Sequence, residues 1–318
     1  MFRALMLTAL LLASSGAAAQ PYPSKPVRIV VPASPGGASD LVGRMVATHL
    51  SETLGQPFIV ENRVTSGGII GTQHVAESAP DGHTLLVTFD TFASNALLFK
   101  NLKWDPIRDF APVMQLCRYP QVLLVHPSLG VRTVKEFVAL AKTRGEHLNY
   151  ASAGPASSSR LAYELFKDVA GIETVPVHYK GGGPAIQDLL SGQVQVMLIQ
   201  GGGAIPQYVK TGKLVALGIS SLAPSKFYPG LATIAETYPG FETESWVAMV
   251  APAGLPRPLI DRLHGALSKM FSDPAVRERF ESQGCDIVAG TPEDLGRVVR
   301  EDQAKWARIV RAKNITVE

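Results

Sequence analysis

Apolar segments with strand character alternate with amphipathic segments along most of the chain. The strand-like segments are short and β-branched, and they end before Pro32, Glu61, Thr88, His126 and Gln200. Segments with apolar residues at helical spacing lie between or after them, at Ala38 to Leu54, Thr133 to Thr143, Ser158 to Ala170, Pro184 to Leu190 and Arg257 to Phe271. This alternation predicts an α/β fold of parallel sheets with helices on both faces. Because 318 residues are many for one such sheet, we expect two lobes.

Glycine-rich turns follow several of the predicted strands. They are SPGGAS from Ser34, TSGGIIG from Thr65, SAGPASSS from Ser152, KGGGP from Lys180 and QGGG from Gln200. Ligands of open parallel sheets bind at the carboxyl ends of the strands. Since two of these turns lie in the first third of the chain and three in the middle third, each lobe would contribute one group to a shared cleft.

The first of these turns, in the stretch from Val27 to Val46, has the composition of an anion site. Gly36 and Gly37 allow a tight turn and a close approach of the backbone to a ligand, and Ser39 and Asp40 can cap the following helix. The amide groups and the positive end of the macrodipole at such a helix start suit a carboxylate or a phosphate. Many α/β proteins have similar turns that bind nothing, so the turn alone leaves both roles open.

The N-terminus predicts export from the cytoplasm. Arg3 is followed by an apolar run to Leu12 and by SSGAAAQ, which is the pattern of a signal peptide cleaved between Ala19 and Gln20. The apolar run is too short for a membrane span, and the rest of the chain has no stretch of about 18 uninterrupted apolar residues. We therefore expect a soluble mature protein that lacks residues 1–19.

Composition and motifs argue against several functional classes. The formal net charge is +3, and it falls to +2 without Arg3, which argues against a nucleic-acid surface. The chain has no GxSxG, HExxH or GxxxxGK[ST] motif and no closely spaced pair of cysteines, so we expect no catalytic residue, no metal and no cofactor. Its two cysteines, Cys117 and Cys285, are far apart; a disulfide stays open as an alternative, but separate small core residues are favoured.

Segments along the whole mature chain match the order of one receptor family. They are YPSKPVRIVVPASPGGASD from Tyr22, LGQPFIVENR from Leu54, GTQHVAESAPDGHTLL from Gly71, WDPIRDFAPV from Trp104, LNYASAGPASSSRLAYELF from Leu148, VPVHYKGGGPAIQDLLSGQVQVM from Val175, GKLVALGIS from Gly212, ESWVAMVAPAGLPRPLIDRL from Glu244 and TPEDLGRVVREDQAKWARIV from Thr291. The chain resembles the extracytoplasmic solute receptors of tripartite tricarboxylate transporters, also called the Bug family.

The resemblance implies a periplasmic-binding-protein-like Venus flytrap fold. Two αβ lobes, joined by crossing strands, would close around a small carboxylated solute in a ligand cleft. Residues 20–119 and 250–318 would form lobe 1, and residues 120–249 would form lobe 2. The resemblance further implies a periplasmic location, delivery of the solute to integral membrane permease subunits and no enzymatic activity. A monomer is the default expectation.

The resemblance also places the ligand carboxylate between two turns, one from each lobe. The first turn would contribute Ser34, Gly36, Gly37, Ala38, Ser39 and Asp40, and the second would contribute Ser152, Ala153, Gly154, Ser157 and Ser158. Backbone amides, serine hydroxyls and ordered waters would donate to the carboxylate. The serines would also cap the helix that starts near Ser158, and we expect both roles.

Departures from the residues common in the family bear on the solute. Arg160 replaces a common histidine and would either fork onto a second ligand carboxylate or lie in solvent, two alternatives that stay open. Gln195 and Gln200 stand where many relatives carry acidic residues that would suit a ligand amine, so an amine-free dicarboxylate or aromatic carboxylate is favoured. Candidate apolar walls, with plain core residues as the alternative, are Tyr22, Phe89 and Tyr179.

Two other functions stay open beside transport. The same receptor could present its solute to a membrane sensor. An exported hydrolase with a loop serine would need a histidine or lysine within hydrogen-bond reach of Ser157, Ser158 or Ser159. The sequence nominates no such base, and Lys180 is expected to be a solvated loop charge.

Overall fold

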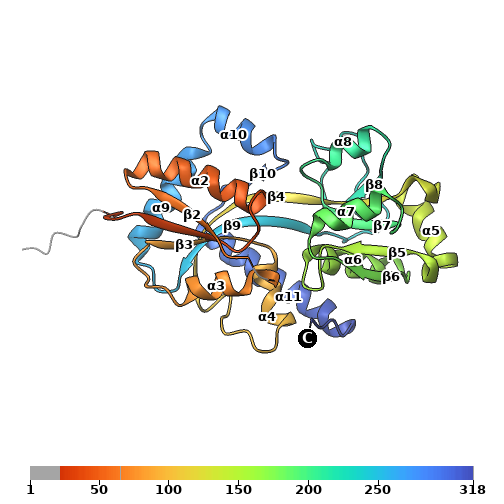
Figure 1. The fold of residues 1–318 in the computed structure, drawn as a ribbon, viewed down its shortest axis with the longest axis horizontal. Helices are drawn as coiled ribbons and strands as arrows, with labels where there is room; N and C mark the ends of the chain where they lie inside the picture. The colour runs from red at the N-terminus through yellow and green to blue at the C-terminus, as the bar shows by residue number, and fades with distance from the viewer. Residues whose placement is uncertain (1–21, 65, 318) are drawn as a thin grey trace, which may run out of the picture.

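Two α/β lobes share one mixed, 10-stranded sheet in the computed structural model, which describes residues 22–64 and 66–317 (Figure 1). The long strands β4 (Phe110–Val125) and β9 (Glu244–Pro252) run from one lobe to the other. The predicted signal peptide and its cleavage site lie outside the described residues. In the described ranges, no helix combines the length and the apolar composition that a membrane span requires.

The first lobe is built on three parallel strands. These are β1 (Val27–Val31), β2 (Phe58–Asn62) and β3 (Thr84–Phe89), and β1 lies in the middle. The helices of this lobe are α2 (Ala38–Leu54), α3 (Ile69–Ala76), α4 (Thr91–Leu98), α9 (Arg257–Met270) and α10 (Pro274–Glu281). Helix α2 has the bounds predicted from its apolar spacing, and it ends where Gly55 adopts the left-handed conformation.

The second lobe repeats this arrangement. Its strands are β5 (Asn149–Ser152), β6 (Val175–His178), β7 (Val196–Gln200) and β8 (Val215–Ile219). Its helices are α5 (Val134–Arg144), α6 (Ser158–Ala170), α7 (Gly182–Leu190) and α8 (Ile205–Lys210). Helix α6 also has its predicted bounds, because Ser157 caps its start and Gly171 ends it in the left-handed conformation.

The prediction of parallel sheets is correct for the outer strands and wrong for the two crossing strands. β1 pairs in parallel with β2 and β3, and β5 pairs in parallel with β6 and β7. β4 and β9 are antiparallel to each other, and each is antiparallel to its other sheet neighbours. The reason is topological: β4 carries the chain into the second lobe and β9 brings it back, so the two must run in opposite directions.

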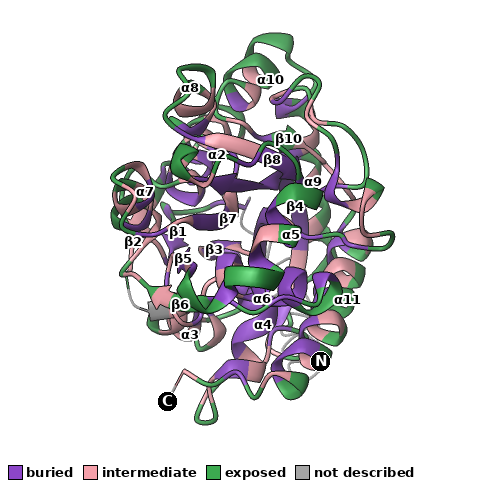
Figure 2. Ribbon diagram, turned by 90° about the vertical axis from the view of Figure 1, so that its right-hand side faces the viewer, coloured by how far each residue is buried: buried purple, intermediate pink, exposed green. Residues whose placement is uncertain are grey.

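Each lobe has its own buried core, and one long helix contributes to both. Figure 2 shows buried residues along the strands and on the inner faces of the helices. In α11 (Pro292–Ala312), Leu295 and Val299 belong to a buried apolar cluster of the first lobe, whereas Trp306 and Ile309 belong to an apolar cluster of the second lobe. The lobe boundaries at 119/120 and 249/250 stay predictions.

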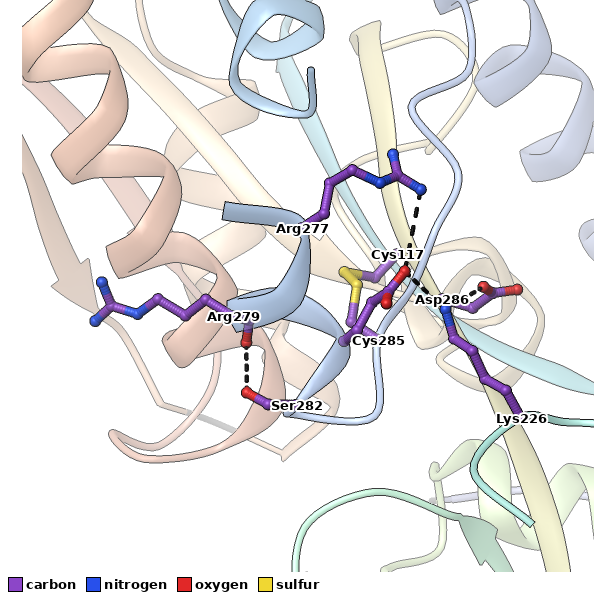
Figure 3. Close-up of a disulfide and its surroundings, with 8 residues drawn as sticks. Cys117, Lys226, Arg277, Arg279, Ser282, Cys285 and Asp286 are labelled. Atoms are coloured by element: carbon purple, nitrogen blue, oxygen red, sulfur yellow. Dashed lines mark hydrogen bonds and ion pairs between the residues drawn. A yellow bond between two sulfur atoms is a disulfide. The ribbon is translucent and has the colours of Figure 1, made fainter. Parts of the chain in front are cut away.

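A disulfide joins Cys117 and Cys285, so the favoured assignment of two separate core cysteines is wrong (Figure 3). Cys117 lies on β4, and Cys285 directly precedes β10 (Asp286–Ile287), which pairs with β4. This pairing brings the two Cα atoms to 5.3 Å although 168 residues separate them in sequence. The separation of the two cysteines in sequence could not indicate this contact, because the pairing of β10 with β4 creates it. The ion pairs of Lys226 with Glu281 and Asp286 lie beside the disulfide and link the second lobe to the first.

Candidate functional site

A cavity of about 930 Å³ lies between the lobes, which is the size expected of a small-molecule site. The first lobe contributes residues 32–34, 37–39, 64, 67–68 and 89–91 to its lining. The second lobe contributes residues 153–158, 178–182 and 200. Tyr119 of β4 and residues 245–247 of β9 complete it, so both crossing strands border the cavity.

Most of the residues predicted to contact a ligand line this cavity. Those that do are Ser34, Gly37, Ala38, Ser39, Phe89, Ala153, Gly154, Ser157, Ser158, Tyr179 and Gln200. Those that do not are Tyr22, Gly36, Asp40, Ser152 and Arg160. The expected opposition of the two turns across one cleft is therefore present in the structure, although each turn also contains residues that only support it.

The first turn brings the start of α2 to the cavity. Gly36 takes a φ of +82°, which favours glycine, and Gly37 is the N-cap residue in an extended conformation. Gly37, Ala38 and Ser39 line the cavity. The first amide groups of an α-helix have no partner within the helix, so this turn presents donors to whatever fills the space.

Asp40 supports this turn from behind and does not cap α2 as expected. The carboxylate is buried, with the residue 1% exposed, and it accepts hydrogen bonds from the Gly36 amide at 2.8 Å, Arg44 Nε at 3.0 Å and Asn62 Nδ2 at 2.8 Å. Burial acts to raise the pKa of Asp40, but the hydrogen bonds from Arg44, Gly36 and Asn62 outweigh it and hold the pKa below its usual value. The Gly36 amide is therefore occupied by the protein's own carboxylate.

The second turn is held mainly by hydrogen bonds among its own serines. Ser157 Oγ donates to the Gly154 carbonyl at 2.7 Å and lies 2.9 Å from Ser159 Oγ, which accepts from the Ala153 amide at 2.8 Å. Ser157 also accepts from the Arg160 amide as the cap of α6. The capping role predicted for this cluster is present in Ser157. Ser158 also lies on the cavity wall, and within the described residues its hydroxyl makes no hydrogen bond in the turn.

Arg160 and Tyr22 are held away from the cavity. The Arg160 guanidinium donates through one Nη to the carbonyls of Pro155 at 2.8 Å and Thr316 at 3.2 Å, and so joins α6 to the chain after α11. Tyr22 is 8% exposed, and its hydroxyl donates to the Gly82 carbonyl at 2.8 Å. Both side chains bind other parts of the protein. In this geometry the Arg160 guanidinium is not placed to bind a second carboxylate of a ligand in the cavity.

Asp90 is a cavity residue that the sequence analysis did not nominate. It directly follows Phe89 at the carboxyl end of β3 and occupies the N-cap position of α4. The residue is 5% exposed, and its side chain makes no cap hydrogen bond. Its Oδ2 has no hydrogen-bond partner in the part of the chain that the structure describes. The available signal was its position, since an acid directly after a buried strand lies where ligands bind α/β sheets.

The surroundings of Asp90 disfavour its charged form. Burial raises the pKa of Asp90 to about 6, the nearby hydroxyl of Ser245 acts against this, and the negative charge of Asp302 raises the pKa further. Ser158 and the Thr91 amide stabilise the carboxylate weakly. None of the four groups with the largest effect on the pKa of Asp90 carries a positive charge.

Three further cavity residues were not predicted from the sequence as ligand contacts. Tyr119 lies on β4 with its hydroxyl buried and without a hydrogen-bond partner in the described ranges, and burial raises its pKa. His178 Nδ1 lies 2.7 Å from Ser152 Oγ, and burial lowers the pKa of His178 and so favours the neutral ring. Lys180 lines the cavity, although the sequence suggested a solvated loop charge.

The geometry does not supply the base that a serine hydrolase needs. Among residues 22–64 and 66–317, no histidine or lysine makes a hydrogen bond to Ser157, Ser158 or Ser159. The serine that meets His178 is Ser152, which is fully buried and outside the cavity lining. The same residues contain no group of three or more histidine, cysteine, aspartate or glutamate side chains that could hold a metal ion.

Two lobes, two crossing strands and a cavity between them define a periplasmic-binding-protein-like solute receptor. The model of the tripartite tricarboxylate transporter family receptor matches residues 42–315, and the chain belongs to this family. The curated relative BugT of Bordetella pertussis is 33% identical and covers 98% of this chain and 97% of its own. The resemblance inferred from the sequence is thus confirmed.

Solved structures agree over almost the whole chain. The periplasmic binding protein BugD has a TM-score of 0.81 and 32% identity and covers 92% of this chain and 99% of its own. Rpa4515 of R. palustris, solved with adipate, has a TM-score of 0.84 and 30% identity over 93% of this chain and all of its own. MatC of Rhodopseudomonas palustris, solved with malate, has a TM-score of 0.80 and 32% identity over 91% of this chain and all of its own.

Proposed function

We propose that this protein is a periplasmic receptor that captures a small carboxylated solute by lobe closure and delivers it to a tripartite tricarboxylate-type permease. The observation that carries the proposal is the convergence of the α2 and α6 helix starts, from different lobes, on one cavity. Adipate and malate, the ligands of two structural neighbours, are both dicarboxylates. The predicted signal peptide supports the periplasmic location.

The arrangement of donors suits binding by closure. Amides at the start of α2 and the hydroxyl of Ser158 at the start of α6 lie on opposite lobes. A carboxylate held by both has all its hydrogen bonds only when the lobes are together, so the ligand stabilises the closed state. The crossing strands are the natural hinge, since β4 and β9 connect the lobes.

Thermal unfolding of the mature protein with a ligand panel tests this function. The panel contains amino acids, dicarboxylates, tricarboxylates and aromatic acids. A ligand at a hundred times its dissociation constant adds about 2.7 kcal/mol, so a true solute raises the unfolding midpoint by about 4 °C in a chain of about 300 residues. A flat result for every carboxylate would refute solute capture of this class.

Uptake of the solute by cells that lack the receptor gene distinguishes transport from presentation to a sensor. Uptake falls if the receptor delivers the solute to a permease, and it is unchanged if the receptor only presents the solute to a sensor.

The sequence favoured an amine-free dicarboxylate or aromatic carboxylate because Gln195 and Gln200 replace acidic residues of relatives. Gln200 lines the cavity, whereas Gln195 accepts from the Asn149 amide and donates to the Gly192 carbonyl outside it. The cavity nevertheless has an acidic side chain at another position, Asp90. The choice between amine-free and amine-bearing acids therefore depends on what Asp90 does.

A further inference from the structure

Asp90 is a buried acidic side chain at the cavity that does not cap the helix it precedes. An aspartate at an N-cap position usually accepts a hydrogen bond from its own helix, but the Asp90 side chain makes no such bond in α4. Its Oδ2 is buried and has no partner within residues 22–64 and 66–317. A buried carboxylate oxygen without a donor is unfavourable, and such groups in native proteins call for an explanation.

The protein's own charges do not compensate this carboxylate. The charge that acts on it is the like charge of Asp302 of α11, whose carboxylate accepts from Trp246 Nε1 at 2.7 Å and pairs with Lys305 Nζ at 3.0 Å. The remaining neighbours that act on it are Ser245, Ser158 and the Thr91 amide, all of them uncharged. Lys180 lines the same cavity but makes no ion pair in the described part of the chain. The main groups that act on this carboxylate therefore include no positive charge that offsets its own.

We infer that Asp90 selects solutes that carry a protonated amine close to their carboxylate. The inference rests on the proposed function and names its substrate class. Ser158, at the start of α6, both lines the cavity and acts on Asp90, so the place for the ligand carboxylate adjoins the place for its amine. An ammonium group supplies a positive charge and a hydrogen-bond donor to the Asp90 carboxylate.

A second ligand carboxylate fits this position worse than an amine. It would place another negative charge beside Asp90 and Asp302 in a space from which lobe closure removes water. Such a ligand binds there only if Asp90 takes up a proton and becomes the donor. An amino acid binds Asp90 in its ionised form, without proton uptake near neutral pH.

Calorimetric titration of the mature chain with matched acid pairs tests the inference. The pairs are aspartate and succinate, glutamate and glutarate, and phenylalanine and 3-phenylpropanoate, each at pH 7.5. We expect at least one amino acid to bind at least tenfold more tightly than its amine-free partner. Asp90→Asn should weaken that amino acid at least tenfold and its partner less than threefold. The control Asp261→Asn, an exposed helix position paired with Arg257, should change neither.

The possible negative results separate failure of the inference about Asp90 from failure of the proposed function. If amine-free acids bind as tightly as their amino acids, or if Asp90→Asn weakens both members equally, the inference is wrong and the proposed function stands. If a diacid binds more tightly as the pH falls from 8 to 5 in the wild type but not in Asp90→Asn, Asp90 is a proton donor to a carboxylate, which also overturns the inference. If no carboxylate of any pair binds, the proposed function fails and this inference fails with it.

Discussion

Replacing Asp90 by asparagine should stabilise the ligand-free protein at neutral pH. Burial, opposed by Ser245 and reinforced by Asp302, raises the pKa of Asp90 from 3.8 to about 6. The folded protein then binds a proton on this group more tightly than the unfolded chain does. The contribution of Asp90 to stability is therefore most favourable below about pH 4, falls as the pH rises to about 6, and stays unfavourable above it. Asparagine has a similar shape and does not titrate.

The size of this effect follows from the pKa. Each pKa unit corresponds to about 1.4 kcal/mol, so the ionised Asp90 carboxylate lowers the free energy of unfolding by about 3 kcal/mol at pH 7.5. A chain of about 300 residues has an unfolding entropy of about 0.6 kcal/mol/K, so Asp90→Asn should raise the unfolding midpoint by about 5 °C. At pH 4, where Asp90 is protonated in the folded protein, the two proteins should unfold at nearly the same temperature.

Scanning calorimetry at pH 4 and pH 7.5 measures this difference, on protein unfolded and refolded to remove any ligand bound during expression. The exposed variant Asp261→Asn is the control, and its midpoint should follow that of the wild type within about 1 °C at both pH values, because surface ion pairs contribute little. If Asp90→Asn is no more stable than the wild type at pH 7.5, the Asp90 carboxylate is already compensated in the ligand-free protein, and the reasoning from an unpaired buried charge is refuted.

Three other substitutions test the parts of the site and the fold. Gly37→Val should reduce ligand affinity at least tenfold and leave the unfolding midpoint nearly unchanged. Gly37 lines the cavity with a φ of −75°, and the atom nearest to an added Cβ is the Ser34 carbonyl oxygen at 3.4 Å. Equal affinity of the variant and the wild type would mean that the turn is only structural. Asp40→Asn should lower the free energy of unfolding by about 1–3 kcal/mol at pH 7, because it weakens charge-assisted hydrogen bonds. Since the pKa of Asp40 is lowered in the fold, this loss should shrink as the pH falls below about 4, and a loss independent of pH in urea titrations would contradict the role of its charge. Cys117→Ala with Cys285→Ala should cost about 2–5 kcal/mol in the same titrations, and no loss in the non-reduced protein would mean that the disulfide does not form.

Local features of the chain were predictable because neighbouring residues decide them. The bounds of α2 and α6 follow from apolar residues at helical spacing, from Ser157 as a cap and from Gly55 and Gly171 as terminators. The glycine-rich and serine-rich turns are equally local, and both lie at the cavity. The order of such segments along the chain was also enough to identify the receptor family.

The roles of individual side chains depended on contacts that sequence distance conceals. Arg160 was nominated as a ligand residue, but it meets the Thr316 carbonyl from the other end of the chain. Cys117 and Cys285 meet because β10 pairs with β4, and β4 and β9 are antiparallel because the chain must return from the second lobe. No local pattern distinguishes these outcomes from their alternatives.

Asp90 illustrates the division most clearly. By itself the sequence predicted a strand that ends before Thr88, with an acid shortly after it, as well as the two turns that suit a carboxylate. Only the tertiary structure decided that this acid is buried at the cavity between two lobes, beside Ser158 and near Asp302, without a donor for one of its oxygens. Propensity and capping act over a few residues, whereas burial and electrostatic environment are set by segments that the fold brings together from distant parts of the chain.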